Sequence, residues 1–544
     1  MSTKIEKLLS NRGFDLAKLI DDKTDYTVTN LNHAAKRINQ AVCEGRHIHV
    51  VADYDCDGVM SGSILYLILR QLGADFTIRF PKRMSEGYGI SEKILKDIPD
   101  KSLVITIDNG IAAVDTIALA NSRGMDVIIL DHHQMREDGV IPNAMCTVNP
   151  HVFKKDNEFE HYCGAGLGYK LAVEMNMPKE IIDKITILAA IATIQDVVPL
   201  IDDNRVIVKK GLKLLNDASV EFDGLYRLCD VLKLRPSNDI SGIQEEDIAF
   251  QIGPCINAMG RMLDDGARDA FEYLMHYDVH GSVGIDQIIE CNKARKDETV
   301  KQQNILEIEA TKYKTKKTTC MVLYAPELKE GLIGINAAKV CEKYNMPAIV
   351  FTDSDEESEV ELLKGSARSV EGIDMKAALD SISELIYKYG GHAGAAGLSI
   401  EKDKLQDFSD AINKTIPKVT ANTNTWKYDF EITESELPLV LAEIRKYAPY
   451  GEGFPAPVVR VNNYHLIKNY GKYYREIGDK GISLNGANSE AISFNMKEKF
   501  RTLGNPLTLN IVGTVGYSSF SKKPQVMIND MQGIIKKQEP GFLL

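Results

Sequence analysis

Short apolar segments that run straight into acidic residues constrain this chain more than any other feature. Three such segments are expected to form buried strands: 47–52 (HIHVVA), 103–107 (LVITI) and 127–130 (VIIL). The polar residues that follow them are Asp53, Asp55 and Asp57, then Asp108, then Asp131, His132 and His133. A turn or a helix cap explains one aspartate after one strand, but it does not explain three strands with the same ending.

The segments between these strands have helical character. Helices are expected at 59–72 and 112–123, and a further strand at 76–80. Strands that alternate with helices predict a doubly wound, mostly parallel α/β sheet. Because sites in such sheets form beyond the carboxyl ends of the strands, the acidic residues and histidines should meet at one edge. Asp196, near the end of an apolar helix expected at 184–198, is a further candidate.

Carboxylates gathered in this way predict a metal site. Asp55 and Asp57 stand two residues apart, so both can face one pocket. Carboxylates so close together repel each other unless cations neutralise them. Carboxylates with imidazoles suit Mn²⁺ or Mg²⁺. The sequence contains no Cys-x-x-Cys pair, so structural zinc is not indicated. Two such ions can activate water and stabilise the leaving oxygen of a phosphoester, so we expect a metal-dependent phosphoesterase.

Composition and the first residues exclude other classes of protein. The net charge is −12, which does not by itself favour a nucleic-acid-binding protein. The nine cysteines are expected to be reduced core residues. Residues 1–20 lack the apolar core of a signal peptide, and no segment approaches the roughly 18 apolar residues of a membrane helix. We therefore expect a cytoplasmic protein without membrane association.

The length of 544 residues and the changes of pattern along the chain predict four domains. Residues 1–201 should form the α/β domain with the acidic edge. Residues 202–313 should form a helical connector that ends in a long, polar, solvent-exposed helix at 285–313. A second α/β domain is expected at 314–419. Short β-like runs in 420–544 predict a small β-barrel behind a polar linker (TANTNT).

The acidic segments, in their order along the chain, are 51–58 (VADYDCDG), 106–110 (TIDNG), 131–133 (DHH) and 195–200 (QDVVPL). Later segments are 253–261 (GPCINAMGR), 365–369 (GSARS), 390–397 (GGHAGAAG) and 449–453 (PYGEG). Together they resemble the DHH phosphoesterase superfamily, and most closely its RecJ-like single-strand-specific exonucleases. The resemblance covers nearly the whole chain. It implies a DHH domain, a DHH-associated nucleic-acid-binding domain and a C-terminal OB-fold.

The resemblance also implies roles for individual residues. The metal ligands would be Asp53, Asp55, Asp57, Asp108, His132 and Asp196, and Asp108 would bridge two ions of Mn²⁺ or Mg²⁺. His133 would complete the catalytic set by contacting the scissile phosphate. The further residues expected at the substrate are Arg261, Arg368, Gly391 and His392. Many superfamily members have a histidine at the position of Val51, and Asp53 is expected to compensate for it.

Residues 465–523 carry nine basic and four acidic side chains, a local balance of +5 (9 − 4). The aromatic residues there are Tyr470, Tyr473, Tyr474, Tyr517 and Phe520. Basic and aromatic residues together suit single-stranded nucleic acid, although burial in a core explains any one tyrosine equally well. Arg83, near Gly87-Tyr88-Gly89, is a further candidate for a phosphate contact, with an ordinary surface loop as the alternative. Trp426 is expected in the core.

These features predict a single-stranded-DNA-specific exonuclease. The resemblance implies 5′→3′ polarity, mononucleotide products and a role in DNA repair and recombination. One alternative is a DHH-family phosphodiesterase that acts on short oligonucleotides or cyclic dinucleotides, and another is a non-catalytic DNA-binding relative. Besides single-stranded DNA, the candidate partners are a single-strand-binding protein and a helicase, and the protein is expected to be a monomer.

Overall fold

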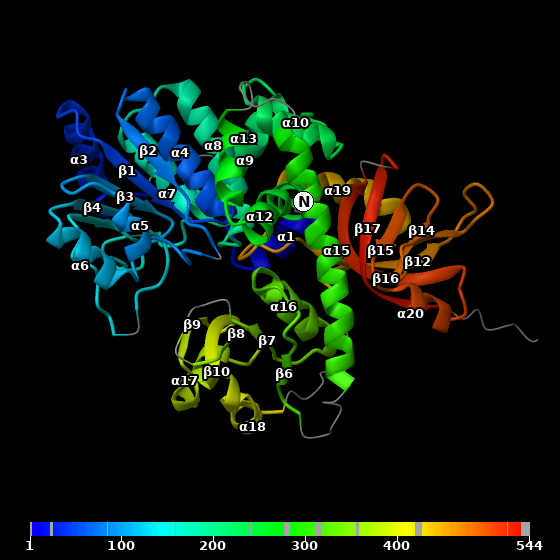
Figure 1. The fold of residues 1–544 in the computed structure, drawn as a ribbon. Coiled ribbons are helices and arrows are strands. Elements are labelled where there is room, and N and C mark those ends of the chain that lie inside the picture. Colours follow the sequence, from blue (N-terminus) through cyan, green and yellow to red (C-terminus); the bar gives the residue numbers. More distant parts are fainter. Residues whose placement is uncertain are drawn as a thin grey trace, which may run out of the picture.

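The residues that the structure describes form three sheets, each with its own hydrophobic core (Figure 1). The first sheet lies at the left of Figure 1, the second at the bottom and the third at the right. The computed structural model describes residues 3–21, 26–83, 85–136, 138–157, 159–239, 241–276, 283–311, 318–354, 358, 360–418, 427–518 and 521–534. The predicted linker at 420–425, Trp426 and Phe520 lie outside these ranges.

The first sheet is parallel throughout and has the order β2-β1-β3-β4-β5. Its strands are β1 (Ile48–Ala52), β2 (Phe76–Arg79), β3 (Leu103–Ile107), β4 (Asp126–Leu130) and β5 (Cys146–Val148). The predicted parallel sheet and its first four strands are confirmed. The sequence did not predict β5, because a strand of three residues is too short to show a periodic pattern.

Helices cover both faces of this sheet. One face packs on α3 (Leu31–Cys43), α4 (Cys56–Gln71), α7 (Gly164–Glu174) and α8 (Lys179–Gln195). The other face packs on α5 (Glu92–Lys96) and α6 (Val114–Ser122). The last residue of α8 is Gln195 and Asp196 caps it, so the predicted end of this helix is confirmed.

The helical connector is present. It consists of α9 (Asp202–Asp217), α10 (Asp223–Val231), α11 (Glu245–Asp247), the π-helix η1 (Ile248–Ile252), α12 (Gly253–Met262), α13 (Gly266–Met275) and α15 (Val283–Thr311). The prediction that its last helix is solvent exposed is wrong at both ends. Ile285 and Ile288 are buried in the core of the first sheet. Leu306 and Ala310 are buried in a core of the second α/β domain. Polarity averaged over 29 residues hides these two apolar contacts.

The second sheet is mixed and has the order β6-β7-β8-β10-β9. Its strands are β6 (Met321–Tyr324), β7 (Ala348–Asp353), β8 (Leu362–Arg368), β9 (Lys388–His392) and β10 (Ala395–Glu401). The helices around it are η2 (Glu330–Leu332), α16 (Ile333–Tyr344), α17 (Met375–Asp380), η3 (Ser383–Leu385), η4 (Lys402–Lys404) and α18 (Leu405–Thr415). The predicted second α/β domain is therefore present.

The third sheet has the order β11-β12-β16-β17-β15-β14-β13. Its strands are β11 (Phe430–Thr433), β12 (Val458–His465), β13 (Tyr474–Ile477), β14 (Gly481–Asn485), β15 (Glu490–Ser493), β16 (Thr508–Ser518) and β17 (Lys523–Gly533). The helices that follow β11 and β15 are η5 (Glu434–Glu436), α19 (Leu437–Lys446) and α20 (Lys497–Thr502). The predicted β-rich C-terminal domain is thus present, and no helix among the described residues is long and apolar enough to cross a membrane.

The first two helices of the chain, α1 (Lys4–Asn11) and α2 (Leu16–Ile20), pack in the core of this C-terminal domain. Ile5 and Leu9 are fully buried there. Arg12 donates hydrogen bonds to the Pro455 carbonyl and the Asp429 carboxylate. The sequence grouped these helices with residues 1–201, but in the structure they stabilise the opposite end of the chain.

This packing predicts where the N-terminal helices matter for stability. Leu9→Ala should destabilise the C-terminal domain by roughly 2 to 5 kcal/mol, because a fully buried leucine leaves a cavity when it is truncated. Hydrogen exchange should quicken in β12 and β16 and stay unchanged in β1 and β3. Leu439→Ala is the matched control, because Leu439 in the same domain is 71% exposed. Faster exchange in β1 and β3 instead would contradict this placement.

Candidate metal centre

The carboxyl ends of β1, β3 and β4 bring the predicted acidic residues and histidines to one edge of the first sheet. Among the described residues, three groups have ligand atoms that lie within 4.8 Å of one another. They are Asp53, Asp55 and Asp108; Asp57, His132 and Asp196; and Asp108, His132 and His133. Asp108 and His132 each belong to two groups, so the residues form one continuous set, called here the ligand cluster.

Asp57 is held by the beginning of α7. It lies in the first turn of α4, where its carboxylate accepts hydrogen bonds from the backbone N–H groups of Gly164, at 2.6 Å, and Ala165, at 2.8 Å. The N-terminus of a helix carries partial positive charge and unpaired N–H groups. Among the described residues, these donors fix the carboxylate without an arginine or lysine partner, and no pattern in the sequence indicates them.

Two glycines let the backbone segments approach closely enough to form the cluster. A Cβ atom on Gly58 would lie 2.2 Å from the Asp53 carbonyl oxygen, and one on Gly164 would lie 2.6 Å from the Asp108 Cβ. Both distances are shorter than any van der Waals contact. Asp55 caps α4 by accepting a hydrogen bond from the Gly58 N–H at 3.1 Å, so one loop serves as both helix cap and ligand source.

Asp108 and His132 are in direct contact at the centre of the cluster. His132 Nε2 lies 3.0 Å from Asp108 Oδ1, 3.6 Å from Asp57 Oδ2 and 3.7 Å from Asp196 Oδ2. Burial, with the neighbouring His133, lowers the pKa of His132 to about 4. The ring is therefore neutral near pH 7 and has a lone pair that can bind a metal.

Asp131, the first residue of the Asp-His-His motif, positions the two histidines. Its carboxylate accepts hydrogen bonds from the backbone N–H groups of Ile111, His132 and His133, and from the His133 ring at 2.8 Å. Although burial raises the pKa of Asp131, the His133 hydrogen bond brings it down to about 2. Sequence reasoning singled out the motif but did not assign Asp131 this role.

The buried carboxylates of the cluster destabilise one another's charged forms. Burial, and then the neighbouring Asp196, raises the pKa of Asp57 to about 6. Burial, and then Asp55, raises the pKa of Asp196 to about 7. Burial, and then Asp55, raises the pKa of Asp53 well above the usual range, and burial, and then Asp57, does so for Asp108. Asp53 Oδ1 is also buried without a hydrogen-bond partner among the described residues. Both observations fit a site that divalent cations complete.

Gln195 and Asn257 fasten the connector to this edge. The Asn257 side chain donates to Gln195 Oε1 at 3.0 Å and accepts from the Cys56 backbone N–H at 3.0 Å. Gln195 Nε2 donates to the Ala249 carbonyl at 3.0 Å. α12 is thereby bonded to the start of α4 and to the end of α8, the two helices that carry Asp57 and precede Asp196. Both side chains stand inside recognised segments, but the sequence did not show that they pair.

Tyr88 is a further residue at the site. Its hydroxyl donates to the Asp108 carbonyl at 3.1 Å and lies 3.3 Å from the His133 ring. Its ring also stands edge-on to Tyr54, with centroids 6.2 Å apart. Sequence reasoning marked this stretch only as a loop that accompanies Arg83, because an isolated tyrosine between two glycines has no distinctive spacing.

Arg83 and Arg261 lie beside the cluster. The Arg83 guanidinium stacks over the Tyr54 ring at 4.7 Å. Burial, and then Arg83, lowers the pKa of Arg261 to about 10. Arg261 also donates to the carbonyl of Gly331, at the start of the second α/β domain, at 3.4 Å. Two arginines this close to each other are suited to an anionic ligand.

The remaining predicted substrate residues lie on the second α/β domain. Arg368 donates to Ser366 Oγ at 3.1 Å and to the Ala367 carbonyl at 2.8 Å. His392 is exposed at the end of β9. Gly391 has a φ of +151°, and a Cβ atom there would lie 2.4 Å from the Ala395 carbonyl oxygen. Its place in the tight β9–β10 hairpin therefore requires glycine with or without a ligand.

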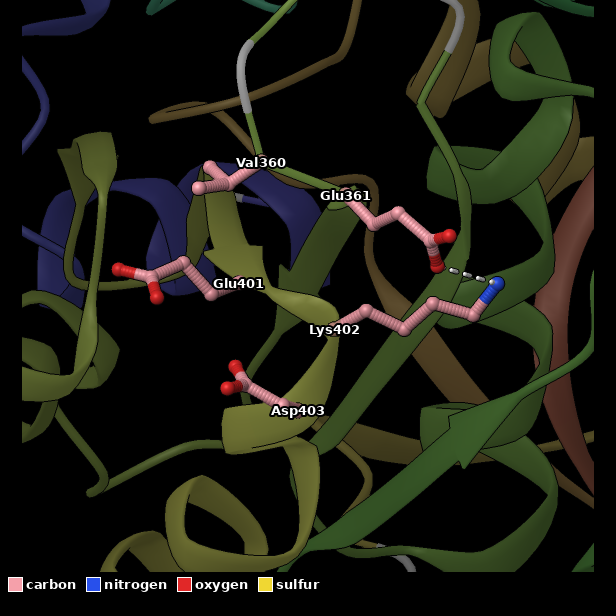
Figure 2. A pocket seen from close by; sticks show the side chains of 5 residues that line it. All are labelled: Val360, Glu361, Glu401, Lys402 and Asp403. Atoms are coloured by element: carbon pink, nitrogen blue, oxygen red, sulfur yellow. Dashed lines mark ion pairs between the residues drawn. The ribbon is translucent and has the colours of Figure 1, made fainter.

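A hollow elsewhere on the second α/β domain is also acidic, but its carboxylates are paired with lysines. It is lined by Val360, Glu361, Glu401, Lys402 and Asp403 (Figure 2). Lys402 pairs with Glu361 at 3.4 Å and with Asp353 at 3.2 Å, and Lys404 pairs with Glu401 at 2.6 Å. Lysines neutralise these carboxylates, whereas the ligand cluster has no such partners among the described residues.

Family models match three segments of the chain. Residues 47–193 match the DHH family, N-terminal domain; residues 317–418 match the DHHA1 domain; and residues 428–530 match the RecJ OB domain. The chain is 30% identical to the single-stranded-DNA-specific exonuclease RecJ of Bacillus subtilis over 97% of this chain and 67% of that protein. It is 28% identical to the RecJ of Escherichia coli over 84% and 82% of the respective chains.

Solved structures show the same fold. RecJ from Thermus thermophilus in complex with Mn²⁺ superposes with a TM-score of 0.76 at 23% identity, covering 98% of this chain and 76% of that one. An exonuclease RecJ bound to manganese gives a TM-score of 0.58 at 26% identity, covering 71% of this chain and 94% of that one.

The raised carboxyl pKa values predict how metal binding depends on pH. Asp57 and Asp196, with pKa values of about 6 and 7, hold protons in the metal-free protein as pH falls from about 8 to 6. Since a cation must displace those protons, Mn²⁺ affinity should fall by about tenfold or more over this range. Isothermal titration with Mn²⁺ at constant ionic strength measures this. Asp196→Asn should bind more weakly and with a smaller pH dependence, and a pH-independent wild-type affinity would refute the argument.

Proposed function

Because this chain belongs to the RecJ family of single-stranded-DNA-specific exonucleases, we propose that it hydrolyses single-stranded DNA from the 5′ end and releases mononucleotides. One observation carries the proposal. Carboxylates and a neutral histidine from β1, β3, β4 and α8 converge within coordination distance at one edge of a parallel sheet. They repel one another there unless cations are bound.

The ligand cluster suits two ions of Mn²⁺ or Mg²⁺. Asp53, Asp55 and Asp108 would hold one ion, and Asp57, His132 and Asp196 the other. Asp108 contacts His132 and belongs to two groups, as a carboxylate shared between the ions would. Bound ions would lower the pKa of a water molecule and neutralise charge on the phosphate.

The chain's own residues would orient the substrate. Asp131 holds His133 with its ring 45% exposed, so the ring can donate a hydrogen bond to a phosphate oxygen beside the ligands. Tyr88 stands edge-on to that ring, with centroids 5.8 Å apart, and would limit its rotation. Arg83 and Arg261 would bind phosphates near the cluster, and Arg368 and His392 would bind them from the second α/β domain. These roles follow from placement and charge.

The C-terminal domain provides a reason for the preference for single strands. OB-folds bind single strands through a basic groove and stacked bases. Tyr470 is fully exposed at the tip of a hairpin, with Lys468 and Lys472 beside it. By contrast, Tyr473 and Tyr474 pack against the domain's core. Only part of the aromatic set is therefore available to stack on bases. We also propose that the protein acts as a monomer, with a single-strand-binding protein or a helicase as partner.

Digestion of end-labelled DNA tests the proposed activity. With Mn²⁺ or Mg²⁺, a single strand labelled at the 5′ end should release labelled mononucleotide from the start of the reaction. Duplex DNA and RNA of the same sequence should be digested far more slowly. Early mononucleotide release from a 3′ label instead would reverse the proposed polarity, and faster digestion of a dinucleotide than of any long strand would contradict the substrate class.

Asp108→Asn should abolish hydrolysis while DNA binding persists. The amide cannot supply the negative charge that two cations share, so the turnover number should fall by roughly a thousandfold or more. Fluorescence anisotropy should show single-stranded DNA binding within a few fold of wild type. Asp115→Asn, an exposed aspartate at the start of α6, is the control. An active Asp108→Asn variant would refute the assignment of the centre.

Arg368→Ala should weaken DNA binding more than chemistry. Loss of one phosphate contact should raise the Michaelis constant several fold and reduce the slope of log affinity against log salt by about 0.7. The turnover number on saturating substrate should change little. Arg227→Ala removes an equal charge from an exposed ion pair on α10 and serves as the control. An unchanged salt slope would show that Arg368 does not contact phosphate.

A further inference from the structure

The C-terminal domain is seated on the loop that follows Asp196. The Leu200 backbone N–H donates to the Glu452 carbonyl at 2.7 Å. Gly451 and Gly453 lie close to this loop. A Cβ atom on Gly451 would lie 3.1 Å from the Leu200 side chain, and one on Gly453 would lie 3.3 Å from the Pro199 side chain. Only three residues separate Leu200 from Asp196, a predicted metal ligand, so the contact surface of this domain adjoins the metal centre.

The first turn of α9 joins three parts of the molecule through consecutive buried polar residues. Asp203 accepts hydrogen bonds from the Tyr162 hydroxyl and, at 3.0 Å, from Lys170, both in the first α/β domain. Asn204 donates to the Pro199 carbonyl at 3.0 Å and so holds the loop itself. Arg205 reaches the C-terminal domain. All three are at most 4% exposed.

Arg205 makes the most extensive of these contacts. Its guanidinium donates to the carbonyls of Tyr447, Ala448 and Pro449, and lies over the Phe454 ring at 4.5 Å. Phe454 is itself fixed by Tyr450, which stacks on it with centroids 5.0 Å apart. A planar fork that bonds to several carbonyls and stacks on a ring fixes orientation as well as distance.

A second contact to the C-terminal domain comes from α11. Glu245, which is buried, accepts from the Tyr450 backbone N–H at 2.9 Å and lies 3.6 Å from Arg445. Arg445 also donates to Gln244 at 2.5 Å. Arg205 and Glu245 thus both hold the segment 447–454 through its backbone. We call this set of contacts the joint.

We propose that Arg205 is a positioning residue that fixes the C-terminal domain relative to the metal centre, so that one long strand occupies both at once. The proposal rests on the function proposed above. Two sites held at a fixed separation bind one ligand with a high effective concentration, and this advantage disappears when their relative orientation is lost. The joint should therefore govern the use of long strands and leave hydrolysis of very short ones unaffected.

The test compares substrates of two lengths in an Arg205→Lys variant. Lysine keeps the charge but replaces the planar fork by a single ammonium group. Because an OB-fold binds about 4 to 16 nucleotides, a trinucleotide cannot fill both sites, whereas a strand of about 50 nucleotides can. For the long strand, kcat/KM should fall about tenfold or more through KM, and digestion should become less processive. For the trinucleotide, kcat and KM should stay within about twofold of wild type.

A matched control and a second variant keep the test decisive. Arg12→Lys makes the same change in an arginine that bonds to Pro455 and Asp429 within the C-terminal unit and not across the joint, so it should leave both substrates unaffected. Thermal unfolding establishes that each variant is folded. If Arg205→Lys does not fold, Phe454→Leu, which removes the ring beneath the guanidinium, should produce the same loss for long strands only.

Binding provides a readout that does not require hydrolysis. By fluorescence anisotropy, the wild-type protein should bind the long strand far more tightly than the trinucleotide, and Arg205→Lys should lose most of that difference. This holds even if the proposed activity fails, so the two failures are distinguishable. An unchanged ratio of long-strand to trinucleotide affinity, or an equal loss for both substrates in a folded variant, would overturn the proposal.

Discussion

The structure around the metal centre depends on the repulsion among buried carboxylates. Four aspartates share a small volume in which burial and their neighbours raise their pKa values. Backbone N–H groups from α7 hold Asp57 in place. Glycines at 58 and 164 allow the segments to approach. Carboxylates this close together need fixed dipoles and bound cations to stabilise their charges. The acidic motifs and the glycines beside them together form such a site.

The sequence predicts those parts of the site that have a side-chain signature. Strands that end in aspartate place Asp53, Asp108 and the Asp-His-His motif at one sheet edge, and the structure brings them together there. The supporting groups were not predictable in the same way. The donors to Asp57 are backbone N–H groups, which any residue offers, and Tyr88 reaches the site from a loop without periodicity.

The fold shows a related limit. The periodic pattern of α1 indicates that Ile5 and Leu9 are buried, but it does not indicate against which core. Adjacency in the sequence suggested residues 1–201, whereas these side chains complete a core that is built mainly from residues after 430. In the same way, average polarity concealed the two buried ends of α15. Local pattern specifies an element and its buried face, and long-range packing specifies the partner.

Buried charge is treated in opposite ways at two points only a few residues apart. At the metal centre, the carboxylates have no lysine or arginine ion pair among the described residues, and their arrangement suits bound cations. At the joint, the cation Arg205 donates to backbone carbonyls and lies over an aromatic ring, so partners for its charge come from within the chain. Because an unpaired buried charge destabilises the fold, each of these charges must keep its partners in place. The segment from Asp196 to Arg205 links a site that needs cations to a contact made between parts of the chain itself. It therefore joins the metal centre to the contact surface of the C-terminal domain through one short stretch of chain.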